Sequence, residues 1–295
     1  MPLLFFAAAA CGLVLSGWGA AGALAGAAYA PPDARSFTVM TFNLHHGIDG
    51  TSRYNLQRAV DAIARIRPGL VGLQEVTRNH SSYRCDDQPA LLAAGLERAT
   101  GRPWHHAYVK EWTVHTDRAC LARGLGDGPN TEGLAFLAPE PIEVVGALVL
   151  PKTRLALAAR VPATRGVPVI VTHLTHGSQG APDRARQVAM IREWAAALGR
   201  PHVLMGDLNA PPGAPELAPL LPAYRDAWAE AAAAGAAGGV PRGTTQIRAA
   251  RRIDYVFFTP GADLRLRSVD TIDTSALIAV HASDHHPVLA SFRVP

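Results

Sequence analysis

Polar side chains able to carry out acid–base or metal chemistry stand where apolar runs of the sequence end. The residues at these ends are Asn43 in FTVMTFNL, Glu75 in LVGLQEV, His173 in VPVIVTHL and Asp207 in HVLMGDLNA. Hydrolysis of a phosphate ester needs ligands for a hard cation, a base for water and donors for the phosphoryl oxygens. These residue types supply all three, so the sequence indicates phosphoester chemistry.

Glu75 and Asn43 fit the preference of Mg²⁺ for oxygen ligands, because this ion binds carboxylate or carbonyl oxygens and keeps several waters. We therefore expect Mg²⁺ as the cofactor, with Mn²⁺ able to replace it. The alternatives are a solvated charge for Glu75 and a hydrogen bond at the strand end for Asn43. A glutamate that follows an apolar strand, beside a second polar strand end, favours the ligand role.

Asp207 and Asn209 are one residue apart, so both side chains would point to one side if the strand continued. Their segment GDLNAPPG is rich in turn formers, and the alternative is an Asx turn. His173 and His285 can each move a proton or stabilise phosphoryl oxygens if a carboxylate fixes the ring tautomer. Two histidines and two carboxyl or amide groups are thus candidates for one cleft.

The elements that must position these residues are mostly strands, with a few helices between them. Apolar runs predict strands over residues 37–44, 70–76, 133–139, 142–150, 155–161, 167–174, 202–210, 251–259, 264–270 and 283–294. Helical spacing predicts helices over 54–66, 88–100 and 182–198, with further helical segments between Pro215 and Ala234 and a Gly/Ala-rich link after them. Residues 101–131 show no clear period, and we expect an irregular loop there.

Several strands between Gly133 and Leu174 leave no room for helices between them. A doubly wound parallel sheet would need a helix after nearly every strand, so it is disfavoured. The pattern instead predicts an α/β sandwich, in which two sheets pack face to face and helices cover the outside.

Six short motifs occur in the order that one family shows, each at a strand end. They are TFNL at 41–44, QE at 74–75, THL at 172–174, GDLNA at 206–210, RIDYVF at 252–257 and SDHHPV at 283–288. On these motifs the chain resembles the endonuclease/exonuclease/phosphatase superfamily, the DNase-I-like metal-dependent phosphoesterases. The resemblance covers essentially all of residues 31–295. It implies a four-layer α/β sandwich of two packed mixed β-sheets flanked by helices.

The resemblance also implies roles for individual residues. Asp207 would orient or deprotonate the attacking water, Asn209 would hold a phosphate oxygen, and Asp254 would be the partner of His285. The implied catalytic set is His173, Asp207, Asn209, Asp254 and His285; the metal set is Asn43, Glu75 and Asp284; and the substrate-binding set is Arg154, Asn209 and His173. The alternative for Asp254 is an ion pair with Arg251 or Arg252 at the strand start.

Other polar residues are expected to have supporting roles. His45 and His46 can shape the pocket beside Asn43, and we interpret His286 as structural. Packing roles are expected for Arg184 and Gln187, and packing or surface roles for His80, His202 and His281. The arginines at 248, 251 and 252 form a basic cluster that could contact a polyanion or cover a solvated turn.

The composition is that of a folded domain with a mildly basic surface. Of 295 residues, 48% are hydrophobic and 18% are charged, so the chain can bury a large core, and no polar low-complexity tract argues for disorder. The formal net charge of +4 suits an anionic substrate but does not by itself indicate nucleic-acid binding. We expect a monomer that needs no protein partner.

Residues 2–30 carry no charge and are dominated by Ala, Gly, Leu and Phe. This predicts a signal peptide or membrane anchor over residues 1–30, followed by one domain over 31–295, in a secreted or periplasmic protein. Removal of the segment would leave Cys85 and Cys120 as the only cysteines. They can form one disulfide in an oxidising compartment, and the alternative is two unrelated thiols.

These observations leave three functions open. The first is a Mg²⁺-dependent phosphodiesterase acting on nucleic acid or a phospholipid head group. The second is a phosphomonoesterase or inositol-phosphate phosphatase with the same site, because these residues do not distinguish one bridging oxygen from two. The third is a non-catalytic binding protein that retains the fold, and the intact set of polar residues argues against it.

Overall fold

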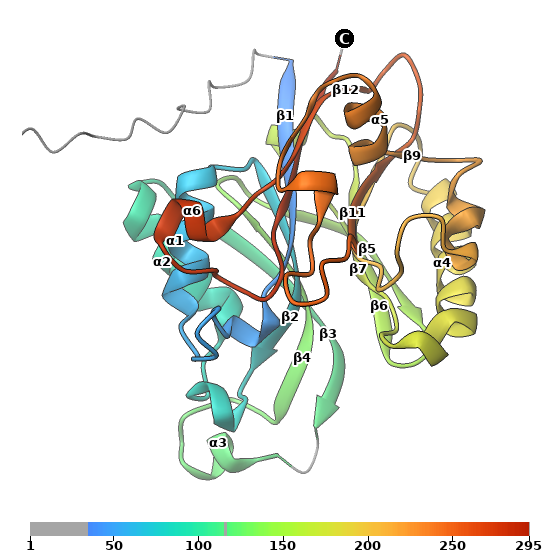
Figure 1. The fold of residues 1–295 in the computed structure, drawn as a ribbon. Helices are drawn as coiled ribbons and strands as arrows, with labels where there is room; N and C mark the ends of the chain where they lie inside the picture. The colour runs from blue at the N-terminus through green and yellow to red at the C-terminus, as the bar shows by residue number, and fades with distance from the viewer. Residues whose placement is uncertain (1–34, 115–116, 295) are drawn as a thin grey trace, which may run out of the picture. The chain divides into compact units, whose positions relative to one another are not determined.

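The computed structural model describes residues 35–114 and 117–294, which form two β-sheets packed face to face (Figure 1). The first sheet has seven strands in the order β10 (Ala237–Gly239), β12 (Arg265–Thr271), β13 (Val288–Arg293), β1 (Ser36–Asn43), β2 (Leu70–Arg78), β4 (Asn130–Ala138) and β3 (His105–Val114). The second has six strands in the order β5 (Glu143–Leu150), β6 (Arg154–Arg160), β7 (Val169–His173), β8 (Val203–Asp207), β11 (Asp254–Phe258) and β9 (Arg225–Asp226). Both sheets are mixed, because β1 and β2 and likewise β7 and β8 run parallel beside antiparallel neighbours.

Helices cover the outer faces of both sheets (Figure 1). The first sheet is covered by α1 (Leu56–Ile66), α2 (Gln88–Thr100) and α6 (Thr274–Ile278), and the second by α4 (Ala181–Ala196). Two further helices are α3 (Ala119–Ala122) and α5 (Ala227–Ala233). The layers are therefore helix, sheet, sheet and helix, and the predicted four-layer α/β sandwich is confirmed.

Apolar side chains from both sheets fill the space between them. Strand residues such as Val39, Phe136, Val171 and Met205 are fully buried in this central cluster. Gly72 lets the sheets approach, because a Cβ at this position would lie 2.6 Å from the Met205 side chain and 2.9 Å from Val171. The apolar strand runs seen in the sequence are thus explained by burial on both faces.

Residues 101–131 are more regular than the sequence indicates. They contain β3, which pairs with β4 at the edge of the seven-stranded sheet, and α3. The expectation of an irregular loop was wrong because an edge strand has one neighbour and needs no continuous apolar run. Most of β3 is exposed or half-buried. The Gly/Ala-rich link also contains a short strand, β10, which pairs with β12.

The last strand is shorter than the predicted range 283–294, since β13 begins at Val288. The preceding SDHHP segment instead lies against residues 245–247. Ile247 donates its amide to the Asp284 carbonyl, and His286 donates its amide to the Thr245 carbonyl, at 3.0 and 2.7 Å. The Ser283 hydroxyl also donates to the Asn43 carbonyl at 2.8 Å. Chemistry-bearing residues therefore leave the sheet while remaining fixed beside β1.

Cys85 and Cys120 form a disulfide, with their Cα atoms 5.5 Å apart. The bond ties α3 to the segment before α2, and it agrees with the disulfide alternative. The predicted signal or anchor over residues 1–30 lies outside the described residues. Within the described part of the chain, no helix is both long and apolar enough to cross a bilayer.

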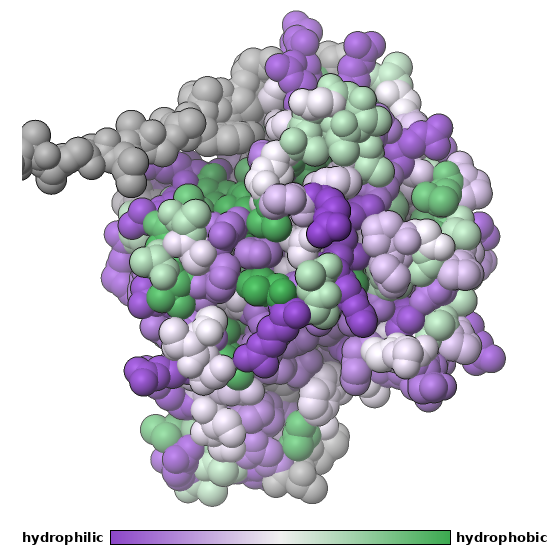
Figure 2. All heavy atoms as spheres, in the orientation of Figure 1, coloured by the Kyte–Doolittle hydropathy of each residue, from purple (hydrophilic) through white to green (hydrophobic). Residues whose placement is uncertain are grey.

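The surface is mostly polar on the face drawn in Figure 2. Hydrophobic residues occur there in small groups among hydrophilic ones. Such scattered apolar residues are normal for a folded domain and give no indication of a broad apolar binding face.

Candidate active site

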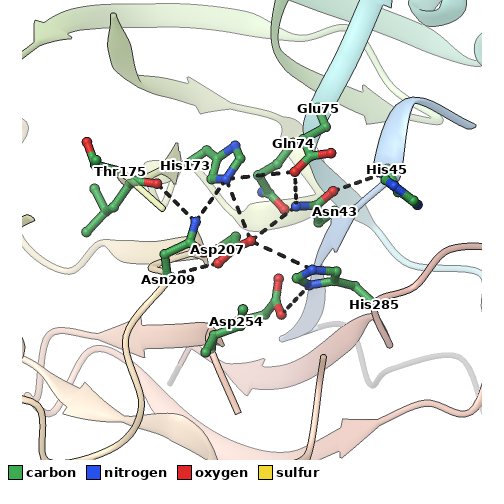
Figure 3. Close-up of polar contacts among 12 residues, drawn as sticks. Asn43, His45, Gln74, Glu75, His173, Thr175, Asp207, Asn209, Asp254 and His285 are labelled. Atoms are coloured by element: carbon green, nitrogen blue, oxygen red, sulfur yellow. Dashed lines mark hydrogen bonds and ion pairs between the residues drawn. The ribbon is translucent and has the colours of Figure 1, made fainter. Parts of the chain in front are cut away.

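Strand ends from the two sheets meet at one cleft, and they carry most of the predicted site residues (Figure 3). Asn43 ends β1 in one sheet, and Asp207 ends β8 in the other. The Asn43 Nδ2 atom donates to Asp207 Oδ2 at 3.1 Å, although the residues are 164 positions apart. Pairing in register then sets His173 beside Asp207 in the parallel strands, and Asp254 beside Asp207 in the antiparallel pair.

A β-bulge directs Glu75 into the cleft. The register between β2 and β4 shifts between Leu73 and Val76, so Gln74 and Glu75 together oppose a single residue of β4, although Gln74 still pairs with Asn43 of β1. Glu75 takes the left-handed conformation with φ 55°. Gln74 is fully buried and bonds to Thr41, whereas the Glu75 side chain stays 21% exposed and lines the pocket. The bulge thus turns the Gln74 side chain into the protein interior and the Glu75 side chain toward the cleft.

A second local constraint presents Asp207. Gly206, which precedes it, has φ +146°, and a Cβ there would lie almost on the Thr172 carbonyl oxygen of β7. Only glycine fits this close approach between β7 and β8. The close packing of β7 and β8 therefore explains the glycine of the GDLNA motif. This glycine lets the two strands present His173 and Asp207 side by side.

Asn43 joins two carboxylates through its amide nitrogen. Its Nδ2 atom donates to Glu75 Oε1 at 2.9 Å as well as to Asp207, and its Oδ1 atom accepts from the His45 backbone amide at 2.9 Å. The amide oxygen therefore faces the backbone in this arrangement. To bind a cation, Asn43 would have to turn over and break these three bonds.

Asp254 and His285 form the predicted pair. His285 Nδ1 lies 2.8 Å from Asp254 Oδ2, and both side chains are buried. Burial by itself would lower the pKa of His285, but the charge and hydrogen bond of Asp254 outweigh it and raise this pKa to about 10. The ring is then an imidazolium at neutral pH, with Nε2 4.0 Å from Asp207 Oδ2. The alternative pairing of Asp254 with an arginine is absent, because Arg252 pairs with Asp226 at 2.7 Å.

Asp207 has the raised pKa expected of a base that works near neutral pH. Burial raises its pKa to about 7, the charge of Asp254 adds to this rise, and His285 opposes it. Its Oδ1 atom accepts the Asn209 backbone amide at 2.9 Å, so the Asx turn that was the alternative for this segment is present. The turn leaves Oδ2 free to face Asn43, His173 and His285, so it does not conflict with a catalytic role for Asp207.

His173 is held as a neutral ring by the arginine that donates to its Nδ1 atom. Arg154 Nη1 lies 3.2 Å from His173 Nδ1, whereas Asn209 Nδ2, 3.1 Å from Nε2, donates to the Leu174 carbonyl oxygen at 3.0 Å. Burial lowers the pKa of His173 well below its usual value, and the Arg154 charge lowers it further. Since arginine only donates, Nδ1 accepts and Nε2 carries the proton. Nε2 also lies 3.7 Å from Asp207 Oδ2.

Sequence reasoning missed Glu111, which lies behind Arg154. Its side chain, on β3, is fully buried; its Oε2 atom is 3.6 Å from Arg154 Nη1, while Oε1 accepts the Leu155 amide at 3.1 Å. Burial raises the pKa of Glu111 to about 8, opposed by the Arg154 charge. Nothing in the sequence indicated Glu111, because β3 was not recognised as a strand. Glu111 fixes the arginine that faces His173.

The histidines at 45 and 46 line the cleft as expected. His45 Nδ1 lies 3.3 Å from Asp284 Oδ1, and His46 lies between Glu75 and Glu132, with ring nitrogens 3.4 and 3.6 Å from their carboxylates. Glu132 is a second residue that the sequence did not single out. Burial raises the pKa of Glu132 above its usual value.

The site fits a divalent cation by its donor set. Glu75 and Asp284 present carboxylates to the same cleft, and His45 Nδ1 is buried there without a hydrogen bond to any described residue. Asp207, Asp254 and His285 form a second buried cluster, whose candidate ligand atoms lie within 4.8 Å of one another. Oxygen-rich ligands of this kind suit a hard ion.

The cleft has a volume of about 750 Å³, which lies in the range of ligand pockets. Cationic and aromatic groups also line the cleft. They are Lys152, Arg154, His176 and Trp112, and the Trp112 residue is 38% exposed. Acidic and basic groups thus line the same cleft, as a site for a metal ion and an anionic ester would require.

Most of the other residues singled out in the sequence have packing roles. Arg184 is buried in an ion pair with Glu216 at 2.6 Å, and Gln187 donates to the Pro151 carbonyl and to Thr175. His202 is buried against Tyr224. Arg252 is also buried and stacks on Trp228 and Tyr255, so it adds nothing to a surface that could bind a polyanion.

Comparison with known proteins gives one family and one fold. The model of the Endonuclease/Exonuclease/phosphatase family matches residues 40–285. Among curated proteins, none matches the sequence. Among solved structures, an endonuclease/exonuclease/phosphatase from Beutenbergia cavernae is 24% identical with a TM-score of 0.66, covering 88% of this chain and 72% of that one.

Two further structures carry more specific names. The human Nocturnin catalytic domain with bound sulfate anion is 19% identical with a TM-score of 0.58, covering 88% of this chain and 94% of that one. A mannosyl-6-phosphatase from Bacteroides thetaiotaomicron is 16% identical with a TM-score of 0.58, covering 87% and 99%. At these identities the likeness concerns the fold alone.

Proposed function

The chain belongs to the endonuclease/exonuclease/phosphatase family, whose members hydrolyse phosphate esters, and on this premise we propose that it is a Mg²⁺-dependent phosphodiesterase acting outside the cytoplasm. One observation carries the catalytic part. A buried imidazolium, His285 paired with Asp254, and a carboxylate with a near-neutral pKa, Asp207, border the cleft that also presents Glu75 and Asp284. Attack of water on phosphorus requires a base that takes the proton of the water and an acid that donates to the leaving oxygen.

Glu75 and Asp284 would hold the cation, with Asn43 joining them only after its amide turns over. When bound, the cation would neutralise charge on the phosphoryl group and lower the pKa of water. Asp207, as a carboxylate, would orient the attacking water and take its proton through Oδ2. Asn43 and His173 keep that oxygen in place, at 3.1 and 3.7 Å.

His285 and the residues around His173 would stabilise the oxygens of the transition state. The His285 Nε2–H group faces the cleft and can donate to a phosphoryl oxygen or to the leaving group. The Nε2–H group of His173 and the Asn209 amide provide two further donors, and Arg154 adds a fixed positive charge. Such preoriented donors usually make the largest contribution to the rate.

The shape of the cleft supports a diester substrate. Its volume leaves room for groups on both sides of a phosphate, and its lining includes the exposed residues Trp112 and Lys152. An exposed indole can stack on a base or pack against a head group. The export proposal is supported by the uncharged residues 2–30 and by the Cys85–Cys120 bond, since disulfides persist in oxidising compartments.

The test is a substrate panel with Mg²⁺ on the chain from residue 31 onward. It includes plasmid DNA, RNA, sphingomyelin, inositol phosphates, bis-nitrophenyl phosphate and mono-nitrophenyl phosphate, each with a His285→Ala control. We expect turnover of a diester that His285→Ala reduces strongly. Turnover confined to monoesters would show a phosphatase instead, and no turnover of any ester would support a non-catalytic protein.

The export proposal has a separate test. The full chain is expressed in a bacterium, the cells are fractionated, and the amino terminus of the product is sequenced. A product cleaved before Pro31 in the periplasm or medium is expected. A full-length product in the cytoplasm would contradict export and leave the catalytic proposal untouched.

A further inference from the structure

A cluster of side chains of the types that ligate metals lies outside the cleft, in the segment that joins β12 to β13. Asp273, His281 and His286 each offer one ligand atom, and these atoms lie within 4.8 Å of one another. None of the three lines the cleft. All three belong to a loop whose two ends are joined by a hydrogen bond, in which the Ile272 amide donates to the Pro287 carbonyl at 2.9 Å.

Two imidazole nitrogens in this cluster lack hydrogen bonds. The Nδ1 atoms of His281 and His286 are both buried, and neither has a hydrogen-bond partner among the described residues. His286 as a residue is only 6% exposed. A buried polar atom without a partner costs free energy, so it calls for a ligand that is not part of the chain.

The contact between His281 and Asp273 strengthens this argument. His281 Nδ1 lies 3.2 Å from Asp273 Oδ1, yet the contact lacks the alignment of a hydrogen bond. A ring nitrogen beside a carboxylate oxygen is an arrangement that a cation bound to both atoms would stabilise. Ligands around a tetrahedral ion with bonds of about 2.1 Å lie about 3.4 Å apart, so this pair already has the required spacing.

We propose that Asp273, His281 and His286 bind a divalent transition-metal ion of the zinc type, with solvent in the fourth position. Two imidazoles and one carboxylate suit Zn²⁺, whereas Mg²⁺ requires oxygen ligands, so this site would differ in metal preference from the cleft. The fourth position is open to water because the side chains of His281 and Asp273 are 31% and 43% exposed.

An ion at this site would restrain the loop that joins β12 to β13. Asp273 begins α6, which packs on α1, and His286 directly follows Asp284 and His285. An ion bound to all three side chains would clip the loop that carries two residues of the cleft. The loop already has one such link, in which Ala282 donates to the Thr274 hydroxyl at 2.9 Å.

The competing explanation is that Asp273 serves only to cap α6. Its Oδ1 atom accepts the Ser275 amide at 2.9 Å and the Ser275 hydroxyl at 2.7 Å. Asp273→Asn separates the two roles, because asparagine caps a helix as well as aspartate does but is a much weaker metal ligand. His281→Gln tests the imidazole at a partly exposed position, and His106→Gln, at an exposed position on β3, is the matched control.

The experiment measures bound Zn²⁺ per chain by equilibrium dialysis, after chelator treatment and in saturating Mg²⁺, together with melting temperature. Co²⁺ absorption serves as a second probe of tetrahedral nitrogen and oxygen ligands. We expect wild type and His106→Gln to bind one more Zn²⁺ than His281→Gln and Asp273→Asn, and only the first two to gain melting temperature from that ion. Equal Zn²⁺ content and equal Zn²⁺-induced shifts in all four proteins would overturn the proposal, even if Zn²⁺ also entered the cleft.

Discussion

Replacing Asp254 by asparagine should remove the charge that keeps His285 protonated. The pKa of His285, about 10, exceeds its ordinary value of 6.5 by an amount that corresponds to about 5 kcal/mol in favour of the imidazolium. Without the Asp254 charge, burial is opposed only by the charges of Asp207 and Asp284, so the pKa of His285 should fall. A larger share of the molecules should then carry a neutral ring at pH 8.

The expected result is a rate deficit that depends on pH. At pH 8 we expect kcat to fall by about 10²- to 10⁴-fold, the range for loss of an acid or of its carboxylate partner. At pH 5.5 the deficit should shrink, because His285 regains its proton. The assay is kcat against pH from 5.5 to 10 on bis-nitrophenyl phosphate with saturating Mg²⁺.

Stability provides an independent readout with a defined sign. The folded-state pKa of His285 is raised, so its contribution to stability is full below pH 6.5 and is lost as the pH rises through about 10. Wild type should therefore lose this contribution between pH 6.5 and 10, and Asp254→Asn should lack it throughout. Melting temperatures across this window measure the difference.

Two further variants complete the test. The double variant Asp254→Asn, His285→Ala should be little slower than His285→Ala, because residues acting as a unit are not additive. Asp226→Asn is the matched control: it weakens the buried ion pair with Arg252 but keeps the cap of α5, so it should lower melting temperature without changing the pH profile. A pH-independent deficit in Asp254→Asn, or fully additive rate losses, would refute the proposed pair.

Three other outcomes follow, two from the site and one from the disulfide. The acid limb of kcat/KM should rise with pH through about 7 as Asp207 loses its proton, and a limb near pH 4 would contradict its role as the base. Glu75→Ala should abolish turnover with little change in melting temperature, EDTA should silence the wild type, and Mg²⁺ or Mn²⁺ should restore it; near-normal activity of Glu75→Ala at saturating Mg²⁺ would rule out the ligand role. Cys120→Ser should cost about 3 to 4 kcal/mol of unfolding free energy for a loop of 35 residues, measured by urea unfolding, whereas two free thiols in unreduced exported protein would show that the bond does not form.

The sequence by itself determined the strands of both sheets that are buried on two faces, and the residues that end them. Apolar runs of five to nine residues are a local property, and so are the polar side chains that follow them. Asn43, Glu75, His173 and Asp207 could therefore be found without a structure. The edge strand β3 could not, because its residues are half exposed and show no clear period. Glu111 was lost with it.

Only the tertiary structure decided which strand ends meet and which way their side chains point. Asn43 and Asp207 are 164 residues apart, and their contact depends on the packing of two sheets rather than on any local pattern. The bulge that turns Glu75 toward the cleft arises from a register shift against β4. Likewise Asp273, His281 and His286 form a cluster only because the loop closes at Ile272 and Pro287. Spacing along a chain limits what a residue can reach, but long-range pairing determines what it contacts.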